Sequence, residues 1–231
     1  LWNWLSRKPN REEPMPYVRP EIAAMTGYAP GEQPQQGRFI KLNTNENPYP
    51  PSPRVAEAIQ DAVRRGLQRY PDSLATEFRE RAGQVLGVDP DWIMAGNGSD
   101  DILTVLTRAL VGQGQRLRMP TPSYILYRTL AQIQGSEVDE VAFDADWGLP
   151  AEFATPVGEP RLAFLPNPNS PTGTVVCSQT ILKIADTLPC PLLIDEAYAD
   201  FADFHCVGLV AKSERIMISR TLSKSYALAG L

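Results

Sequence analysis

Apolar residues follow two kinds of spacing along the chain from residue 39 onward. In some stretches they recur every three or four residues, as Val55, Ile59 and Val63 do, which predicts amphipathic helices. Between these stretches lie short apolar runs bounded by Gly, Pro or charged residues, which predict buried strands. We expect helices over 53–67, 74–86, 99–110, 124–134 and 178–188, and strands over 92–95, 116–119, 137–142, 162–165, 192–194 and 216–219.

This alternation determines the expected fold class. Strands that are joined through helices pair in parallel by right-handed crossovers, and the helices then cover both faces of the sheet. We therefore predict an α/β fold with three layers, a largely parallel sheet flanked by helices. The segment 1–38 lacks the pattern and is rich in Pro, Glu, Gln and Gly. We expect it to form an extended arm with one short helix at 20–26.

Composition excludes several classes of function. The 231 residues carry a net charge of −5, whereas a nucleic-acid-binding surface needs a basic field. Cys177, Cys190 and Cys206 have neither an even count nor CxxC spacing, so we expect no disulfide framework and no metal site. We assign these cysteines and the single His205 structural roles. Because no apolar run is long enough for a membrane span and no signal peptide is recognisable, we expect a cytoplasmic protein.

Glycine and proline gather directly after two of the expected strands, where open α/β sheets bind their ligands. Gly96-Asn97-Gly98-Ser99-Asp100 precedes a helix, so its N–H groups can bind a phosphate, but Ser99 can equally serve as an ordinary helix cap. The loop 166–173 contains three prolines and is either a rigid turn or part of a site. A nucleotide-binding module is not supported, because the chain has neither GxGxxG nor a P-loop motif.

A carboxylate and an amine follow the last two expected strands. Asp195 either caps the next helix or pairs with a cationic ligand, because a carboxylate at a buried strand end needs a cation or several donors. Tyr198 would then supply a phenol one turn later. Lys224 lies among hydroxyl residues and is either an ordinary surface lysine or a buried nucleophile.

Seven motifs occur in one order along the chain: Asn43-Thr44-Asn45-Glu46-Asn47-Pro48, Arg69-Tyr70-Pro71-Asp72, Gly96-Asn97-Gly98-Ser99-Asp100, Pro120-Thr121-Pro122-Ser123-Tyr124, Asn169-Ser170-Pro171-Thr172-Gly173, Asp195-Glu196-Ala197-Tyr198 and Thr221-Leu222-Ser223-Lys224. Together they resemble the fold-type I pyridoxal 5′-phosphate (PLP) aminotransferases. The first two favour the histidinol-phosphate branch of that family. The resemblance implies that residues 42–231 form an incomplete PLP-binding large domain and residues 1–41 an N-terminal arm or small-domain segment.

The resemblance also implies catalytic roles for three residues. Lys224 would form the Schiff base with the cofactor aldehyde and then move a proton between substrate and cofactor. Asp195 would pair with the ring nitrogen and keep it protonated, which makes the ring an electron sink. Tyr198 would hydrogen-bond the phenolic oxygen of the ring.

The remaining roles concern binding. By the same resemblance, Tyr124 would stack on the cofactor ring, Asn47 would lie near the substrate, and Tyr70 would reach the phosphate of the neighbouring subunit, so a homodimer is implied. The groups expected to hold the cofactor phosphate are the backbone N–H groups of Ser99 and Asp100 and the hydroxyls of Thr221 and Ser223.

The sequence departs from the family pattern in two places. The family has Asn before Pro-Thr-Gly, which bonds the phenolic oxygen, whereas this chain has Ser170, so the preceding Asn169 is our candidate for that contact. Family members also continue well beyond the Schiff-base lysine. We therefore expect the C-terminal small domain of the family to be absent from this sequence.

The resemblance implies transamination of histidinol phosphate with 2-oxoglutarate, a step of histidine biosynthesis. Its partners would be an amino donor, a 2-oxo acid acceptor and a second copy of the chain, with neither nucleic acid nor membrane involved. Two alternatives remain open. One is another fold-type I enzyme, either an aromatic aminotransferase or an amino-acid-phosphate decarboxylase, and the other is a catalytically incompetent fragment.

Overall fold

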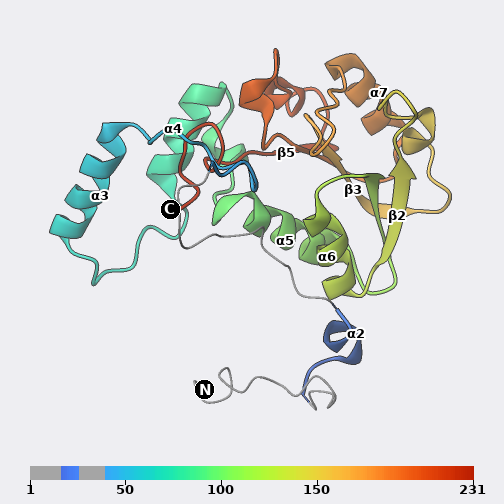
Figure 1. The fold of residues 1–231 in the computed structure, drawn as a ribbon, viewed down its shortest axis with the longest axis horizontal. Helices are drawn as coiled ribbons and strands as arrows, with labels where there is room; N and C mark the ends of the chain where they lie inside the picture. The colour runs from blue at the N-terminus through green and yellow to red at the C-terminus, as the bar shows by residue number, and fades with distance from the viewer. Residues whose placement is uncertain (1–16, 26–39) are drawn as a thin grey trace.

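One parallel sheet organises the part of the chain that the computed structural model describes, which is residues 17–25 and 40–231 (Figure 1). Its strand order is β2-β1-β3-β4-β5, and every adjacent pair is parallel. The α/β class and the parallel sheet are therefore confirmed. The strands are β1 (Arg116–Thr121), β2 (Glu137–Ala142), β3 (Pro160–Pro166), β4 (Leu192–Asp195) and β5 (Ile216–Ser219).

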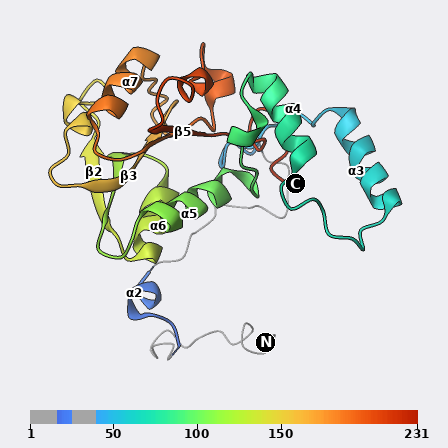
Figure 2. The ribbon, with the colours of Figure 1, turned by 180° about the vertical axis from the view of Figure 1, so that it is seen from behind.

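Helices cover both faces of this sheet, as Figures 1 and 2 show from opposite sides. Helices α5 and α6 pack on one face, and α7 packs on the other. The longer helices are α3 (Pro53–Arg65), α4 (Thr76–Leu86), α5 (Gly98–Leu110), α6 (Ile125–Gln134) and α7 (Ser178–Thr187). The short helices are α2 (Pro20–Ala23), η1 (Pro90–Trp92), η2 (Ala151–Ala154), η3 (Ala199–Phe201) and η4 (Val207–Leu209).

The central strand β3 contributes to two hydrophobic cores. Leu162 and Phe164 point to the face covered by α5 and α6, while Ala163 and Leu165 point to the face covered by α7. All four are buried. This follows from the period of two along a strand, and it explains why a strand buried on both faces is an uninterrupted apolar run.

The register of the sheet aligns the strand ends that matter for a site. Pro166 of β3 lies opposite Asp195 of β4, which lies opposite Ser219 of β5. The carboxyl ends of three neighbouring strands therefore form one edge. The strand order also reverses between β1 and β3, because β2 lies on one side of β1 and the later strands lie on the other. Such a reversal opens a crevice for ligands at this edge.

One predicted strand is wrong. Residues 92–95 were expected to form a strand, but η1 occupies Pro90–Trp92 and no strand follows before α5. Trp92 and Met94 are more than half exposed. A strand needs a neighbour to pair its backbone groups, and none of the described strands lies beside this segment. The arm prediction falls largely outside the described residues, apart from α2, which is shorter than the expected helix 20–26.

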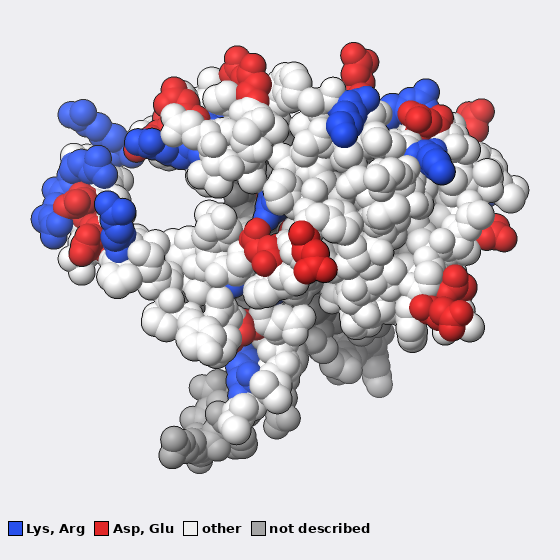
Figure 3. Space-filling model, turned by 90° about the horizontal axis from the view of Figure 1, so that it is seen from above, with Lys and Arg blue, Asp and Glu red and all other residues white. Residues whose placement is uncertain are grey.

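The charged surface of the molecule is mixed in sign. On the face shown in Figure 3, Lys and Arg side chains are interspersed with Asp and Glu. Among the described residues, no helix combines the length and the apolar character needed to cross a membrane.

A buried arginine links two strands of the sheet to η2, and its removal should lower the stability of the fold measurably. Arg118 of β1 is 3% exposed, pairs with Asp139 of β2, and donates to the carbonyl oxygens of Glu152 and Phe153, the latter at 2.9 Å. Arg118→Met leaves these acceptors unpaired and should lower the free energy of unfolding by about 2 kcal/mol, measured by urea denaturation. The control Arg161→Met removes an exposed arginine of β3 and should change it by less than about 0.5 kcal/mol. Equal losses in both variants would contradict this account.

Candidate active site

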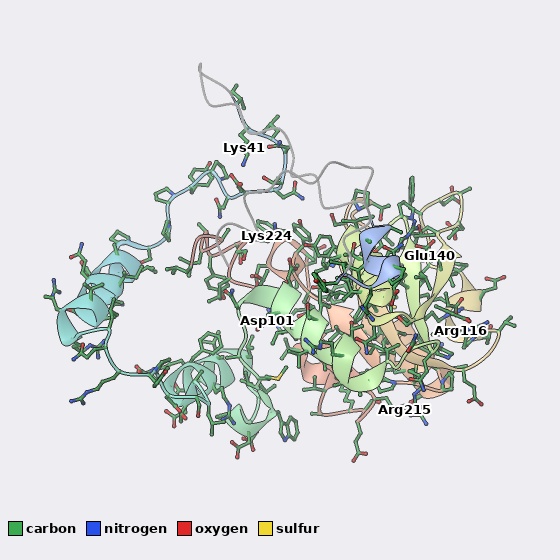
Figure 4. The ribbon with its side chains drawn as sticks, turned by 90° about the horizontal axis from the view of Figure 1, so that it is seen from below. Lys41, Asp101, Arg116, Glu140, Arg215 and Lys224 are labelled. Atoms are coloured by element: carbon green, nitrogen blue, oxygen red, sulfur yellow. The ribbon has the colours of Figure 1, made fainter. Side chains whose placement is uncertain are left out.

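A cavity of about 210 Å³ lies at the carboxyl edge of the sheet. Most of the side chains predicted from the sequence line it, although they come from four separate segments of the chain. These residues are Ser99, Asp100, Tyr124, Asp195, Tyr198, Thr221, Ser223 and Lys224. Figure 4 labels Lys224 on the segment after β5, beside the N-terminal end of α5.

One wall of the cavity is the beginning of α5. Gly98 has a φ of +76°, a conformation that L side chains rarely adopt, and this lets the chain turn sharply into the helix. The residue at the N-cap position, Asn97, makes no side-chain capping hydrogen bond. The N–H groups of the first turn therefore remain available to an anion in the cavity. The expectation that Ser99 caps the helix is wrong, because the helix already includes it.

Asp195 supplies the buried carboxylate of the cavity. It is 4% exposed and accepts hydrogen bonds from the Tyr127 hydroxyl at 2.7 Å, the Ser219 hydroxyl at 3.1 Å and the Ala197 N–H at 3.2 Å. Burial raises the pKa of Asp195 above its ordinary value, while these donors act against the rise. Among the described residues, no Lys, Arg or His forms an ion pair with it. The site thus holds an acid positioned for a cation that this part of the chain does not supply.

Lys224 lines the same cavity and contacts the segment that contains residues 43–47. Its Nζ is 3.4 Å from the carbonyl oxygen of Thr44 and 5.7 Å from the centre of the Tyr198 ring. The Tyr198 hydroxyl in turn accepts a hydrogen bond from Asn45 Nδ2 at 2.9 Å. Asn47 Nδ2 donates to the backbone carbonyl of Lys224 at 3.1 Å. The amine and the phenol are therefore held together by a segment far away in the sequence.

Two charged groups anchor the segment that carries Lys224 to the segment after β4. Arg220 pairs with the buried Glu196 at 3.3 Å and also with Asp200. Ser225, directly after Lys224, donates to the same Asp200 carboxylate. The lysine therefore sits between two anchored residues, which limits where its amine can reach.

Three predicted residues do not line the cavity. Asn47 donates to the backbone carbonyls of Lys224 and Ser225 and accepts from the Tyr49 N–H, and Tyr70 is fully exposed. Asn169 lies at an adjoining cavity of about 450 Å³, and its amide group donates to Pro122 O at 3.1 Å and Thr172 Oγ1 at 2.8 Å. Ser170, which we regarded as the departure from the family pattern, lines the main cavity instead.

Sequence reasoning missed three residues of the site. Tyr127 and Ser219 donate to Asp195, and Asn45 donates to Tyr198. Asn45 belongs to the motif Asn43-Thr44-Asn45-Glu46-Asn47-Pro48, and Ser219 ends a predicted strand, but neither pairing is local in the sequence. Tyr127 follows Tyr124 by three residues on an amphipathic helix, a position typical of core packing.

Residues 38–231 match the family model described as aminotransferase class I and II. The chain belongs to this family. It is 55% identical to a histidinol-phosphate aminotransferase of Rhodopirellula baltica over 92% of this chain and 59% of that protein. It is 46% identical to histidinol-phosphate aminotransferase 1 of Trichormus variabilis over 93% of this chain and 61% of that protein.

A solved structure extends the likeness to the fold. Histidinol-phosphate aminotransferase from Sinorhizobium meliloti, determined in complex with pyridoxal 5′-phosphate, is 26% identical and superposes with a TM-score of 0.72. The match covers 81% of this chain and 53% of that one. The chain spans about three fifths of the length of the curated relatives it matches.

PLP is the cofactor of these aminotransferases, and the residues of the cavity fit it. The cofactor carries an aldehyde, a basic ring nitrogen and a phosphate. The cavity offers one group for each: the amine of Lys224, the buried and otherwise unpaired charge of Asp195, and the uncapped start of α5. Within the described ranges, no group of three or more His, Cys, Asp or Glu is placed to hold a metal ion.

Proposed function

We propose that residues 42–231 form the PLP-binding large domain of a histidinol-phosphate aminotransferase, with residues 1–41 as its arm or small-domain segment. The reaction would transfer an amino group from histidinol phosphate to 2-oxoglutarate. The observation that carries this proposal is that the Lys224 amine and the unpaired Asp195 carboxylate line one cavity. The names of the relatives at 55% and 46% identity favour the substrate.

The catalytic roles follow from the chemistry of the three residues. When bound, PLP would supply a protonated ring that withdraws electrons from the substrate carbon. Lys224 would hold the cofactor covalently through Nζ and, once released, move the proton to and from that carbon. Asp195 would keep the proton on the ring nitrogen, and Tyr198 would donate its phenol hydrogen to the ring oxygen.

The binding roles rest on the walls of the cavity. The first N–H groups of α5 at Ser99 and Asp100 would bind the cofactor phosphate, together with the hydroxyls of Thr221 and Ser223. Those two hydroxyls already lie 3.0 Å apart. Tyr124 would stack on the ring of the cofactor, since its own ring lines the cavity. Its hydroxyl donates to the Asp100 carboxylate at 3.2 Å, which restricts the position of the Tyr124 ring. Ser170 would replace Asn169 as the neighbour of the ring, since only Ser170 lines this cavity.

We also infer that the chain forms a homodimer. Helix α3 has an apolar stripe but buries none of its residues within the chain, and Ile59 and Val63 remain exposed. In both views it stands away from the sheet, at the end of the molecule (Figures 1 and 2). An uncovered stripe of this kind is typical of an interface. The fully exposed Tyr70 follows α3 and would reach the second subunit.

A cytoplasmic location is our further proposal. The structure contains three free cysteines, Cys177, Cys190 and Cys206, and the last two are buried. Burial raises the pKa of both thiols to about 11, which keeps them protonated and unreactive. Free thiols of this kind suit a reducing compartment.

Half-reactions test the proposed substrate. The PLP-loaded chain should convert histidinol phosphate at least about tenfold faster than phenylalanine or O-phosphothreonine. A tenfold difference in rate corresponds to about 1.4 kcal/mol of transition-state stabilisation, which contacts specific to one substrate can supply. The measurement is the loss of the visible absorbance of the bound cofactor. Faster conversion of phenylalanine would favour an aromatic aminotransferase, and release of carbon dioxide from O-phosphothreonine a decarboxylase. If no amine reacts although PLP is attached, the chain is a catalytically incompetent fragment.

A further inference from the structure

Tyr127 of α6 is the most tightly enclosed side chain that contacts Asp195. Its exposure is 0%, and its ring packs against Phe164 with ring centroids 4.8 Å apart and edge-on against Tyr124 at 5.7 Å. These contacts fix the ring. Its hydroxyl donates to Asp195 Oδ2 at 2.7 Å, across 68 residues of sequence. Tyr127 also lines the cavity.

The two oxygens of Asp195 are occupied differently. Oδ1 accepts from the Ser219 hydroxyl and from the Ala197 N–H. Oδ2 accepts only from Tyr127 among the described residues. A carboxylate has about four lone-pair sites, two on each oxygen. Oδ1 is therefore filled, whereas Oδ2 keeps one site for a donor that enters the cavity.

We propose that Tyr127 is a positioning residue, which holds Asp195 so that Oδ2 receives the protonated ring nitrogen of the cofactor. The inference rests on the proposed function and deepens it. Tyr127 itself would not touch the nitrogen. It would act on the same oxygen atom, by fixing the direction of its remaining lone pair and by favouring the ionised carboxylate.

The state of the Tyr127 hydroxyl agrees with this role. Burial, followed by the neighbouring charge of Asp195, raises the pKa of the hydroxyl well above its ordinary value. The hydroxyl therefore stays protonated at neutral pH and remains a donor to Oδ2. A hydroxyl that donates to Oδ2 keeps this oxygen an acceptor.

The test compares two ligands that differ at one ring atom. PLP has the nitrogen, and its 1-deaza analogue has a C–H group in the same place. Tyr127→Phe should weaken binding of PLP by about tenfold and binding of the analogue by less than about twofold, so that the preference for PLP shrinks by about tenfold. Dissociation constants are measured by equilibrium dialysis on the 231-residue chain. Tyr17→Phe removes the same hydroxyl from an exposed position and should change neither constant.

The outcomes separate this inference from the proposed function. If the unmodified chain binds neither ligand, or binds both equally, the proposed cofactor site fails and the inference fails with it. If the unmodified chain prefers PLP and Tyr127→Phe keeps the full preference, only the inference fails. An equal loss for both ligands would mean that Tyr127 merely supports the fold.

A second variant covers the case in which Tyr127→Phe does not fold, as judged by circular dichroism. Tyr127→3-fluorotyrosine keeps the hydroxyl and adds one fluorine as a reporter. Its fluorine resonance should shift on addition of PLP and shift less on addition of the deaza analogue. Equal shifts for the two ligands would overturn the inference.

Discussion

Lys224→Ala is expected to remove the covalent attachment of PLP and to slow conversion of histidinol phosphate by about 10²- to 10⁴-fold, the usual contribution of a positioned acid–base group. Lys224 offers the amine that lines the cavity, and Arg220 and Ser225 on either side are anchored to acidic residues. The measurements are the yield of protein-bound cofactor after borohydride reduction and the single-turnover rate.

Two further variants make this prediction specific. Lys224→Arg keeps the positive charge, but an arginine does not lose its proton in proteins, so it should fail like alanine. Lys212→Ala removes an exposed lysine and should leave both readouts unchanged. Retention of the covalent attachment in Lys224→Ala would contradict the assignment of this lysine.

Asp195→Asn is expected to have opposite effects on binding and on stability. It should weaken binding of PLP by about 100-fold, because truncating one partner of a buried, hydrogen-bonded charge pair typically costs 2 to 5 kcal/mol. It should also stabilise the cofactor-free chain by about 0.5 to 2 kcal/mol at pH 7, because an amide has no charge to bury. Equilibrium dialysis and urea denaturation measure the two effects.

The pH dependence gives the sign of the second effect. Burial raises the pKa of Asp195 in the folded chain above its ordinary value of 3.8. The folded chain therefore binds this proton more tightly than the unfolded chain, and stability falls as the pH rises from about 4 through the raised pKa. The gain from Asp195→Asn should be present at pH 7 and absent at pH 3. A variant that loses stability at pH 7 would show that Asp195 supports the fold rather than a ligand.

Local patterns were sufficient to predict most of the fold. The spacing of apolar residues predicted β2 and β5 with the bounds that the structure has, and it placed α3 and α7 within two residues. The segment 92–95 failed for a physical reason: its four residues carry a strand-like composition, but pairing depends on a neighbour that the local sequence does not encode. The amphipathic stripe of α3 likewise predicted a helix without indicating what covers it.

The residues of the candidate site also differ in how far the local sequence indicates them. Asp195 could be singled out because it ends a buried strand, where a carboxylate needs a cation or several donors. Lys224 stands five residues beyond β5, and its role was expected only from the resemblance to the aminotransferase family. Tyr127 could not be singled out, because a tyrosine on the apolar face of a helix has the same pattern as any core residue. Its function depends on one hydrogen bond to a residue on another element, and only the packing of α6 on the sheet creates that contact. The placement of Ser170 rather than Asn169 at the cavity also depends on the loop conformation.

The most direct test of the central claim is to locate the lysine that captures PLP. The intact chain is incubated with PLP, reduced with borohydride, digested and analysed by mass spectrometry. The chain also contains Lys8, Lys41, Lys183 and Lys212 as internal competitors. The account predicts a pyridoxyl group on Lys224 as the main product at one equivalent of cofactor. Labelling spread evenly over the lysines, or a folded chain that leaves Lys224 unlabelled, would contradict it.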